Sequence, residues 1–240
     1  MRLGLIQTRG LGDIVIAAPI AQYYVDQGHE VYWPVDHFFY PSVKAAFPEI
    51  GFLQLEPELS QGAGRNYFLD RPLEILRTLA CDPIVPLYSY LSGLPVTNSA
   101  LARSLKFDEY KYAVCNVPFS FKWKLKIKRN MQRENSLFES LHVSEPFVLA
   151  HNRGSNVLVE LPLQEQTRKT RVVYIDERTN NPFDWLMTIE LASEVHFIDS
   201  VFANIVEQLK LNNSAFLYLR SQVGFTPVFQ HLHVTKYELV

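Results

Sequence analysis

The first 35 residues carry a pattern of apolar and polar positions that predicts a strand, a loop, a helix and a second strand. An apolar run at 3–6 leads into the polar, glycine-containing segment 8–13. From 14 to 25 the apolar residues recur on a broad helical face, and a second apolar run follows at 30–35. The segment therefore predicts a β-loop-α-β unit, whose crossover is almost always right-handed when the two strands are parallel.

Three residues mark the ends and the middle of this predicted helix. Asp13 is a residue type that caps helix N-termini, and Gly28 is suited to the left-handed position that ends a helix. Pro19 lies inside the helix, where it predicts a kink or a break after the first turn.

The alternation of strands and helices continues along the chain in two series. In the first half the pattern predicts helices at 40–47, 72–79 and 91–105, strands at 50–55 and 84–87, and a loop at 60–66. In the second half it predicts strands at 147–150, 171–175, 195–198 and 215–219, a loop at 151–156, and helices at 134–141, 182–192 and 200–209. Strands that alternate with helices form parallel sheets, so we expect an α/β protein with two Rossmann-like domains.

The composition changes around 116–135, where apolar and basic residues alternate and a polar run follows. We place the domain boundary there. The prediction is an N-terminal Rossmann-like domain at 1–120, a linker region at 121–141, and a C-terminal Rossmann-like domain at 142–240.

Charge and composition narrow the class of protein. The net charge of −2 gives no global attraction to nucleic acid or to an anionic membrane, so such an affinity would need a local patch. Cys81 and Cys115 are too few for a disulfide framework and lack metal-ligand spacing, so we expect two buried free thiols. The N-terminus lacks the pattern of a signal peptide, and no apolar run reaches the roughly 20 residues of a membrane-spanning helix. These features predict a cytoplasmic enzyme or binding protein with no transmembrane segment.

The glycine loop before the first helix is the first candidate site. Gly10 and Gly12 let the backbone approach a ligand or nucleotide closely, and the start of the helix offers unpaired N–H groups. Asp13 can cap the helix, or it can face a cleft and take a proton from a bound hydroxyl. The spacing alone favours the capping role.

Polar residues that follow predicted strands of the second half form the second candidate site. Asp199 and Ser200 end a strand and open a helix, where they can bind a phosphate group or merely cap the helix. Arg153 suits a diphosphate because its planar fork can donate two hydrogen bonds. Three further residues follow predicted strands. His151 can donate to the phosphates, and Asp176 and Glu177 can accept from ribose hydroxyls. For each of the three the alternative is a purely structural role.

A run of basic residues alternates with apolar ones after 120. In an extended chain Lys122, Lys124, Lys126 and Lys128 share one face. Such a face is most simply a solvated strand or linker. The alternative is that these lysines contact a phosphate-rich acceptor, such as a nucleic acid or an anionic glycan, and Arg9 beside the glycine loop is a candidate for the same kind of contact.

Two segments resemble one family of enzymes. The opening LGLIQTRGLGDIVIAAPIAQYYVDQGHEVYW resembles the N-terminus of the heptosyltransferase-type glycosyltransferases, the ADP-heptose:lipopolysaccharide family (glycosyltransferase family 9). The segment EVHFIDSVFANIVEQL resembles the C-terminal strand, Asp-Ser/Thr and helix signature of the same family. The resemblance implies a compact version of the GT-B fold, in which two Rossmann-like domains with parallel sheets face a central cleft. It also implies that the domain at 1–120 lies on the acceptor side and that the domain at 142–240 binds the nucleotide sugar.

The resemblance also implies roles for the matching residues. Asp13 matches the acid proposed as catalytic base, which deprotonates the acceptor hydroxyl. Asp199 and Ser200 match the pair at the donor nucleotide-sugar site, and Arg153 lies in the loop that helps to hold the donor diphosphate. Enzymes of this type need no metal, which agrees with the absence of a Cys/His/carboxylate cluster or a DxD motif from the sequence.

The sequence therefore predicts a metal-independent glycosyltransferase with no cofactor besides its nucleotide-diphosphate-sugar co-substrate. It would move a hexosyl, heptosyl or pentosyl group to a hydroxyl acceptor, with Asp13 as general base. Two alternatives stay open: a phage-type glycosyltransferase that modifies DNA, and a non-catalytic sugar-nucleotide-binding protein on the same fold.

Overall fold

The chain divides into two compact units, Met1–Lys128 and Arg129–Val240. The computed structural model describes residues 1–56, 68–89, 98–143, 146–154, 158–163, 170–212, 214–219 and 226–236. The loop predicted at 60–66, and the part of the predicted helix 91–105 that precedes residue 98, lie outside the described residues. The division between the units falls inside the region 121–141.

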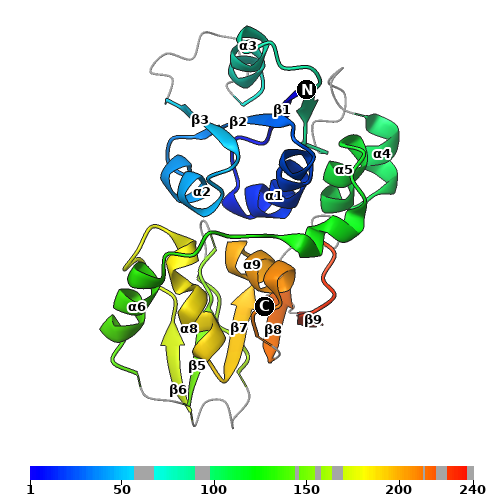
Figure 1. Ribbon diagram of the computed structural model, residues 1–240. Helices are drawn as coiled ribbons and strands as arrows, with labels where there is room; N and C mark the ends of the chain where they lie inside the picture. The colour runs from blue at the N-terminus through cyan, green and yellow to red at the C-terminus, as the bar shows by residue number, and fades with distance from the viewer. Residues whose placement is uncertain are drawn as a thin grey trace. The chain divides into compact units, whose positions relative to one another are not determined.

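The first unit is built on a parallel sheet with strand order β3-β2-β1-β4. Its strands are β1 (Arg2–Ile6), β2 (Glu30–Asp36), β3 (Gly51–Leu55) and β4 (Ile84–Pro86). Its helices are α1 (Leu11–Asp26), α2 (Tyr40–Ala46), α3 (Asp70–Thr78), α4 (Ser99–Ser104), α5 (Phe107–Val114) and the 3₁₀ helix η1 (Phe119–Lys124). Figure 1 shows α1 and α2 on one face of this sheet and α3 on the other.

Helix α1 is the buried centre of the first unit. Every residue from Ile14 to Gln22 is buried, as expected for a helix that is apolar nearly all round. The helix runs from Leu11 to Asp26 without interruption, so of the two outcomes predicted at Pro19, a kink or a break, the break does not occur. Proline removes one backbone hydrogen bond, and the packing of α1 against β2, α5 and η1 offsets that loss.

The end of α1 agrees with the prediction made from Gly28. Gly28 adopts a left-handed conformation with φ of 79°, and its N–H donates to the carbonyl oxygen of Val25. The N–H of His29 donates to the carbonyl oxygen of Tyr24. These two bonds form a Schellman motif, which satisfies carbonyl groups that the helix leaves unpaired and turns the chain into β2.

The apolar-basic alternation after residue 120 is not extended from its start, which is the condition under which the four lysines would share one face. Residues Phe119–Lys124 are the 3₁₀ helix η1 instead, and the chain becomes extended only after it. Lys122 is buried in this helix, where its ammonium group forms an ion pair with Asp108. The alternation of apolar and basic residues does not reveal this partner, because Asp108 lies 14 residues earlier in the chain. Helix α5, which carries Asp108, was not predicted.

The second unit is built on a parallel sheet with strand order β6-β5-β7-β8-β9. Its strands are β5 (Phe147–His151), β6 (Arg171–Tyr174), β7 (Glu194–Ile198), β8 (Ala215–Leu219) and β9 (His233–Lys236). Its helices are α6 (Met131–Ser140), the 3₁₀ helix η2 (Pro182–Trp185), α8 (Leu186–Leu191) and α9 (Val201–Leu209). The predicted helix at 182–192 is thus split in two, and β9 was not predicted.

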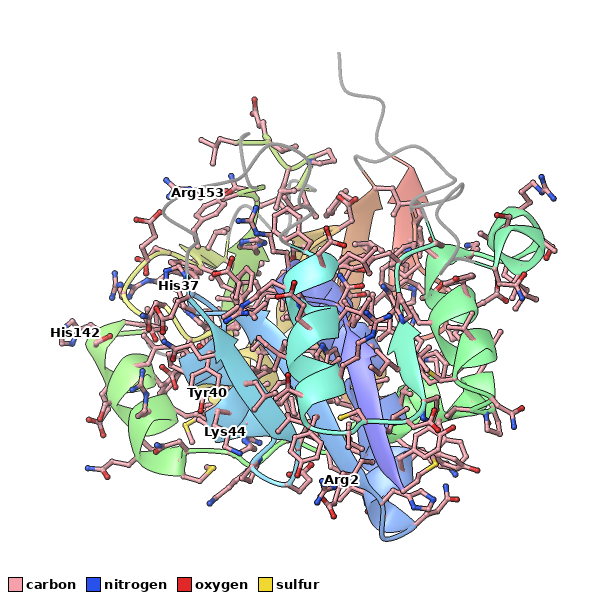
Figure 2. The ribbon with its side chains drawn as sticks, turned by 90° about the horizontal axis from the view of Figure 1, so that it is seen from above. Arg2, His37, Tyr40, Lys44, His142 and Arg153 are labelled. Carbon is pink, nitrogen blue, oxygen red and sulfur yellow. The ribbon has the colours of Figure 1, made fainter. Side chains whose placement is uncertain are left out.

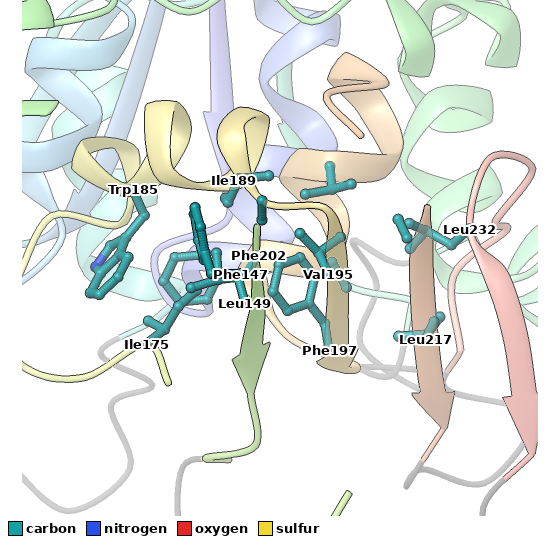
Figure 3. Close-up of a cluster of buried hydrophobic side chains, with 14 of the residues drawn as sticks. Phe147, Leu149, Ile175, Trp185, Ile189, Val195, Phe197, Phe202, Leu217 and Leu232 are labelled. Atoms are coloured by element: carbon teal, nitrogen blue, oxygen red, sulfur yellow. The ribbon is translucent and has the colours of Figure 1, made fainter. Parts of the chain in front are cut away.

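Apolar side chains from strands and helices meet on one face of the second sheet. Trp185 and Ile189 pack over Phe147 of β5 and Phe197 of β7, and all four are at most 1 % exposed (Figure 3). Phe202, in the first turn of α9, belongs to the same cluster. This packing fixes the start of α9 against the end of β7, where Asp199 and Ser200 lie.

The two cysteines are free and buried, as predicted from the sequence. Burial raises the pKa of the Cys115 thiol to about 12, so this thiol is unreactive at neutral pH. In the described part of the chain, no helix combines the length and the apolar character that crossing a membrane requires.

Candidate active site

The candidate site of the first unit lies at the carboxyl edge of its sheet. In the order β3-β2-β1-β4, the chain leaves β1 toward one side and later returns to place β4 on the other side. Ligands of open parallel sheets bind at such a reversal, beyond the carboxyl ends of the two strands. Here those ends lead into residues 7–10 after β1 and into Leu87 and Tyr88 after β4.

Asp13 is part of the first turn of α1 but does not cap the helix. The N-cap position belongs to Gly10, which is left-handed with φ of 78°, and Asp13 is the third helical residue. No side chain caps this helix, so the capping role that the spacing favoured is wrong. A left-handed N-cap needs glycine, and this moves the start of the helix two residues ahead of Asp13.

The carboxylate of Asp13 has one oxygen toward the protein and one toward the glycine loop. Oδ1 lies 3.2 Å from Nζ of Lys111, while Oδ2 lies 2.6 Å from the point where a Cβ atom on Gly10 would be. The Asp13 side chain is one-third exposed. Gly10 is therefore needed twice, for its backbone conformation and for the space that the carboxylate occupies.

Lys111 of α5 is a member of this site that we did not predict. Its ammonium group donates hydrogen bonds to Oε1 of Gln7 at 2.7 Å and to the carbonyl oxygen of Leu87 at 3.1 Å, besides the ion pair with Asp13. Gln7 in turn donates from Nε2 to the carbonyl oxygen of Arg9 at 2.7 Å. The end of β1, the end of β4 and the start of α1 are thus joined at one ammonium group.

Tyr88 joins the same two strand ends by a second route. Its hydroxyl accepts a hydrogen bond from the backbone N–H of Thr8 at 2.8 Å and lies 2.9 Å from Oγ1 of Thr8. Burial is the main reason why the pKa of Tyr88 is raised above its ordinary value. The residue therefore stays a neutral phenol and holds the backbone that leads into Gly10.

Arg9 extends the carboxyl edge toward β2. Its Nε atom lies 3.2 Å from Oδ2 of Asp36, the last residue of β2, and its guanidinium group stacks over Phe68 at 4.0 Å from the ring centroid. Nδ1 of His37, a residue labelled in Figure 2, lies 3.0 Å from the other carboxylate oxygen of Asp36. More than half of the Arg9 side chain is exposed, so it remains a candidate for an acceptor contact.

The candidate site of the second unit lies at the corresponding reversal of its own sheet, between β5 and β7. Ser200 is the N-cap residue of α9, yet its hydroxyl makes no capping hydrogen bond. Oγ of Ser200 is buried and has no hydrogen-bonding partner among the described residues. The same holds for Oδ1 of Asn204, whose amide donates instead to the carbonyl oxygen of Ser200 at 3.0 Å. Asp199 precedes this pair at the end of β7.

The acids that follow β6 are both engaged with arginines at the surface. Glu177 forms an ion pair with Arg153, the residue predicted to hold a diphosphate and labelled in Figure 2. Asp176 accepts from Nε of Arg178 at 2.8 Å. His151 packs its ring at 4.7 Å from the ring of Phe202, at the start of α9. Sequence reasoning did not foresee that Arg153 and Glu177 would come together.

Glu177 also lines an open pocket of about 1000 Å³ in the second unit. Helix α6 contributes Arg133 to this pocket, and Asp184, which forms an ion pair with Arg133, lines it as well. The carboxylate of Asp184 accepts hydrogen bonds from Arg133, Thr179 and Asn181, at distances of 2.6 to 3.1 Å. The charges of this pocket are therefore largely satisfied within the protein.

The four lysines of the predicted basic face have four different environments. Lys122 is fully buried, with Nζ 2.8 Å from Oδ2 of Asp108. Lys124 lies over the ring of Phe121, and Lys126 pairs at the surface with an aspartate of α1. Lys128 is exposed. The prediction of one shared face is therefore wrong, and Lys122 is unavailable to an acceptor.

Comparison with known proteins identifies structural relatives only. No family model matches the chain, and no curated protein matches it. A glycosyl transferase family 9 structure from Veillonella parvula aligns with a TM-score of 0.58 and 12 % identity, over 98 % of this chain and 84 % of that chain. TibC, described as a bacterial iron-containing dodecameric glycosyltransferase of enterotoxigenic E. coli, aligns with a TM-score of 0.56 and 12 % identity, over 100 % of this chain and 63 % of that chain.

A structure of TibC in complex with ADP-D-β-D-heptose aligns equally well, with a TM-score of 0.56, 13 % identity and coverage of 99 % of this chain and 62 % of that chain. At such identities the likeness concerns the fold. The fold predicted from the two terminal motifs, with two parallel α/β halves, is confirmed. Among the residues that the structure describes, no group of three or more His, Cys, Asp or Glu side chains could hold a metal ion.

Proposed function

We propose that this chain, which has the fold of family 9 glycosyltransferase structures, transfers a sugar from a nucleotide-diphosphate-sugar donor to a hydroxyl acceptor. The observation that carries the proposal is the position of Asp13. Its partly exposed carboxylate stands at the strand reversal where ligands of such sheets bind, and it is not used as a helix cap.

In this proposal Asp13 is the general base. The acceptor oxygen forms a bond to the anomeric carbon of the sugar while the bond between that carbon and the diphosphate oxygen breaks. The acceptor proton passes to the Asp13 carboxylate, and the nucleoside diphosphate leaves. Because Oδ1 already faces Lys111, Oδ2 beside the glycine loop is the oxygen that would take the proton.

The start of α9 is the proposed site of the donor phosphates. The first-turn N–H groups of a helix attract anions, and α9 has no side-chain cap that would compete for them. The buried hydroxyl of Ser200 adds a donor that has no partner among the described residues. These groups would stabilise the charge that develops on the leaving diphosphate, without a metal ion.

The test separates binding from chemistry with two variants. A thermal-shift screen in EDTA first identifies a donor that stabilises the protein, from a panel of nucleotide sugars that includes ADP-heptose, a ligand in a TibC structure. Turnover of that donor is then measured with water as acceptor. We expect Asp13→Asn to keep the donor Kd and lose turnover by about 10²–10⁴-fold, the usual contribution of a general base. Ser200→Ala should weaken the donor Kd by about tenfold, one hydrogen bond to a charged group.

Full turnover by Asp13→Asn would remove Asp13 from the mechanism. Donor binding without any turnover of the unaltered protein, with a range of hydroxyl acceptors added, would instead favour a non-catalytic sugar-nucleotide-binding protein.

A further inference from the structure

We propose that Lys111 is the positioning residue for Asp13: its buried ammonium group holds Oδ1 of the carboxylate so that Oδ2 faces the acceptor hydroxyl. The inference rests on the proposed function, because it assigns a task to Asp13 in transfer. Lys111 itself touches no substrate in this proposal, and it acts only through the carboxylate.

The coordination of the ammonium group is the first argument. A lysine ammonium has three N–H donors, and three oxygens surround Nζ of Lys111 at 2.7, 3.1 and 3.2 Å. They belong to Gln7, Leu87 and Asp13, which come from three different elements of the first unit. The ammonium therefore has a fixed place relative to both strand ends, and the carboxylate that contacts it has a fixed place too.

The distribution of burial is the second argument. The Lys111 side chain is 2 % exposed, whereas the Asp13 side chain is 33 % exposed. The pair thus has a sealed cationic side and an open anionic side. The other buried lysine of this unit differs, because Lys122 and its partner Asp108 are both 0 % exposed and present nothing to solvent. A pair that serves packing alone has no need of an open carboxylate.

The third argument is the cost of the arrangement. A buried ammonium loses its hydration, and only one of the three oxygens around Lys111 carries a formal charge. A methionine of similar length would fill the same space without that cost. What the lysine adds, and methionine lacks, is a directional contact to Asp13.

A double-mutant cycle on turnover tests the proposal, with the donor found in the thermal-shift screen and water as acceptor. We expect Lys111→Met to lower kcat by about a hundredfold, the scale of a misplaced catalytic group, and to leave the KM for the donor unchanged. In an Asp13→Asn background the same change should alter the residual kcat by less than about twofold, since the two substitutions then act on one contact. Lys122→Met is the matched control, because it removes an equally buried ammonium that contacts α5 but not Asp13.

Additive effects of the two substitutions on kcat would overturn the proposal, and so would an equal loss of kcat in Lys122→Met. If Lys111→Met does not fold, Lys111→Gln keeps a donor for Leu87 while it removes the charge. A second cycle on urea unfolding needs no activity. If the unaltered protein turns over no donor, the proposed function fails, but the unfolding cycle still tests whether Lys111 holds Asp13. A midpoint shift of the double variant smaller than the sum of the two single shifts supports the positioning of Asp13, and additive shifts overturn it.

Discussion

Loss of the Lys122 ammonium should destabilise the first unit far more than loss of its surface neighbour Lys126. Nζ of Lys122 lies 2.8 Å from Oδ2 of Asp108, and both side chains are completely buried. Nζ of Lys126 lies at the same distance from Oδ2 of Asp26, but those two side chains are 66 % and 58 % exposed. The two lysines are four residues apart and differ mainly in their access to water.

The magnitudes follow from that difference. Removing one member of a buried ion pair typically costs about 3–5 kcal/mol, because the remaining charge stays in a medium that solvates it poorly. An exposed pair is worth about 0–1 kcal/mol, since water and salt already screen both charges. With a denaturant slope of about 2 kcal/mol/M, Lys122→Met should lower the urea midpoint by about 2 M and Lys126→Met by less than about 0.5 M.

Urea unfolding followed by tryptophan fluorescence gives these midpoints, because Trp33 and Trp123 both belong to the first unit. The combined variant Asp108→Leu with Lys122→Met checks the cause: removing both charges should restore most of the lost stability. Equal midpoint shifts for Lys122→Met and Lys126→Met would refute the reasoning, and so would a combined variant less stable than Lys122→Met alone.

Two further predictions concern the glycine loop and the second sheet. Gly10→Ala and Gly28→Ala should each lower the free energy of unfolding by about 1–2 kcal/mol, the cost of a left-handed alanine. Only Gly10→Ala should lower turnover, because its Cβ would lie 2.6 Å from a carboxylate oxygen of Asp13, whereas nothing lies within 4 Å of a Cβ at Gly28. Urea midpoints measure the first effect and kcat the second, and equal kcat values for the two variants would contradict the prediction. Burial lowers the pKa of His196 despite the opposing effect of Glu194, so the unfolded state binds the proton more readily and stability should fall as the pH drops below the ordinary value of about 6.5. In His196→Phe the free energy of unfolding should depend less on pH between pH 7 and pH 5 than in the unaltered protein. An unchanged pH dependence would exclude His196 as its source.

The strands and the helix α1 could be predicted because their patterns are local. Each buried parallel strand reads as a short apolar run, and the polar residues directly after it mark the carboxyl edge of the sheet. Asp13, Ser200 and Arg153 were chosen as candidate site residues in this way. The sequence offered a further signal that we did not use: the polar residues Gln7 and Thr8 directly follow the apolar run of β1. The structure shows that both are buried at this edge of the sheet.

Helix α5 could not be predicted by the same reasoning. Its buried residues are Asp108, Tyr110, Lys111 and Tyr112, so two of the four are charged. A pattern analysis assigns such residues to the solvent side of a helix. The charges are buried because their partners come from far along the chain, 104 residues away for Gln7 and 14 for Lys122. Periodicity contains no information about those partners.

The long-range bonds of the first glycine loop have a consequence for synthesis of the protein on the ribosome. The sequence motif around Asp13 leaves the exit tunnel early, but Tyr88 bonds to Thr8 across 80 residues and Lys111 bonds to Gln7 across 104. At about 5–20 residues per second, the loop waits several seconds for the residues that hold it. The nascent chain therefore carries the proposed catalytic carboxylate of Asp13 for several seconds before Lys111, the residue that holds it, has been translated.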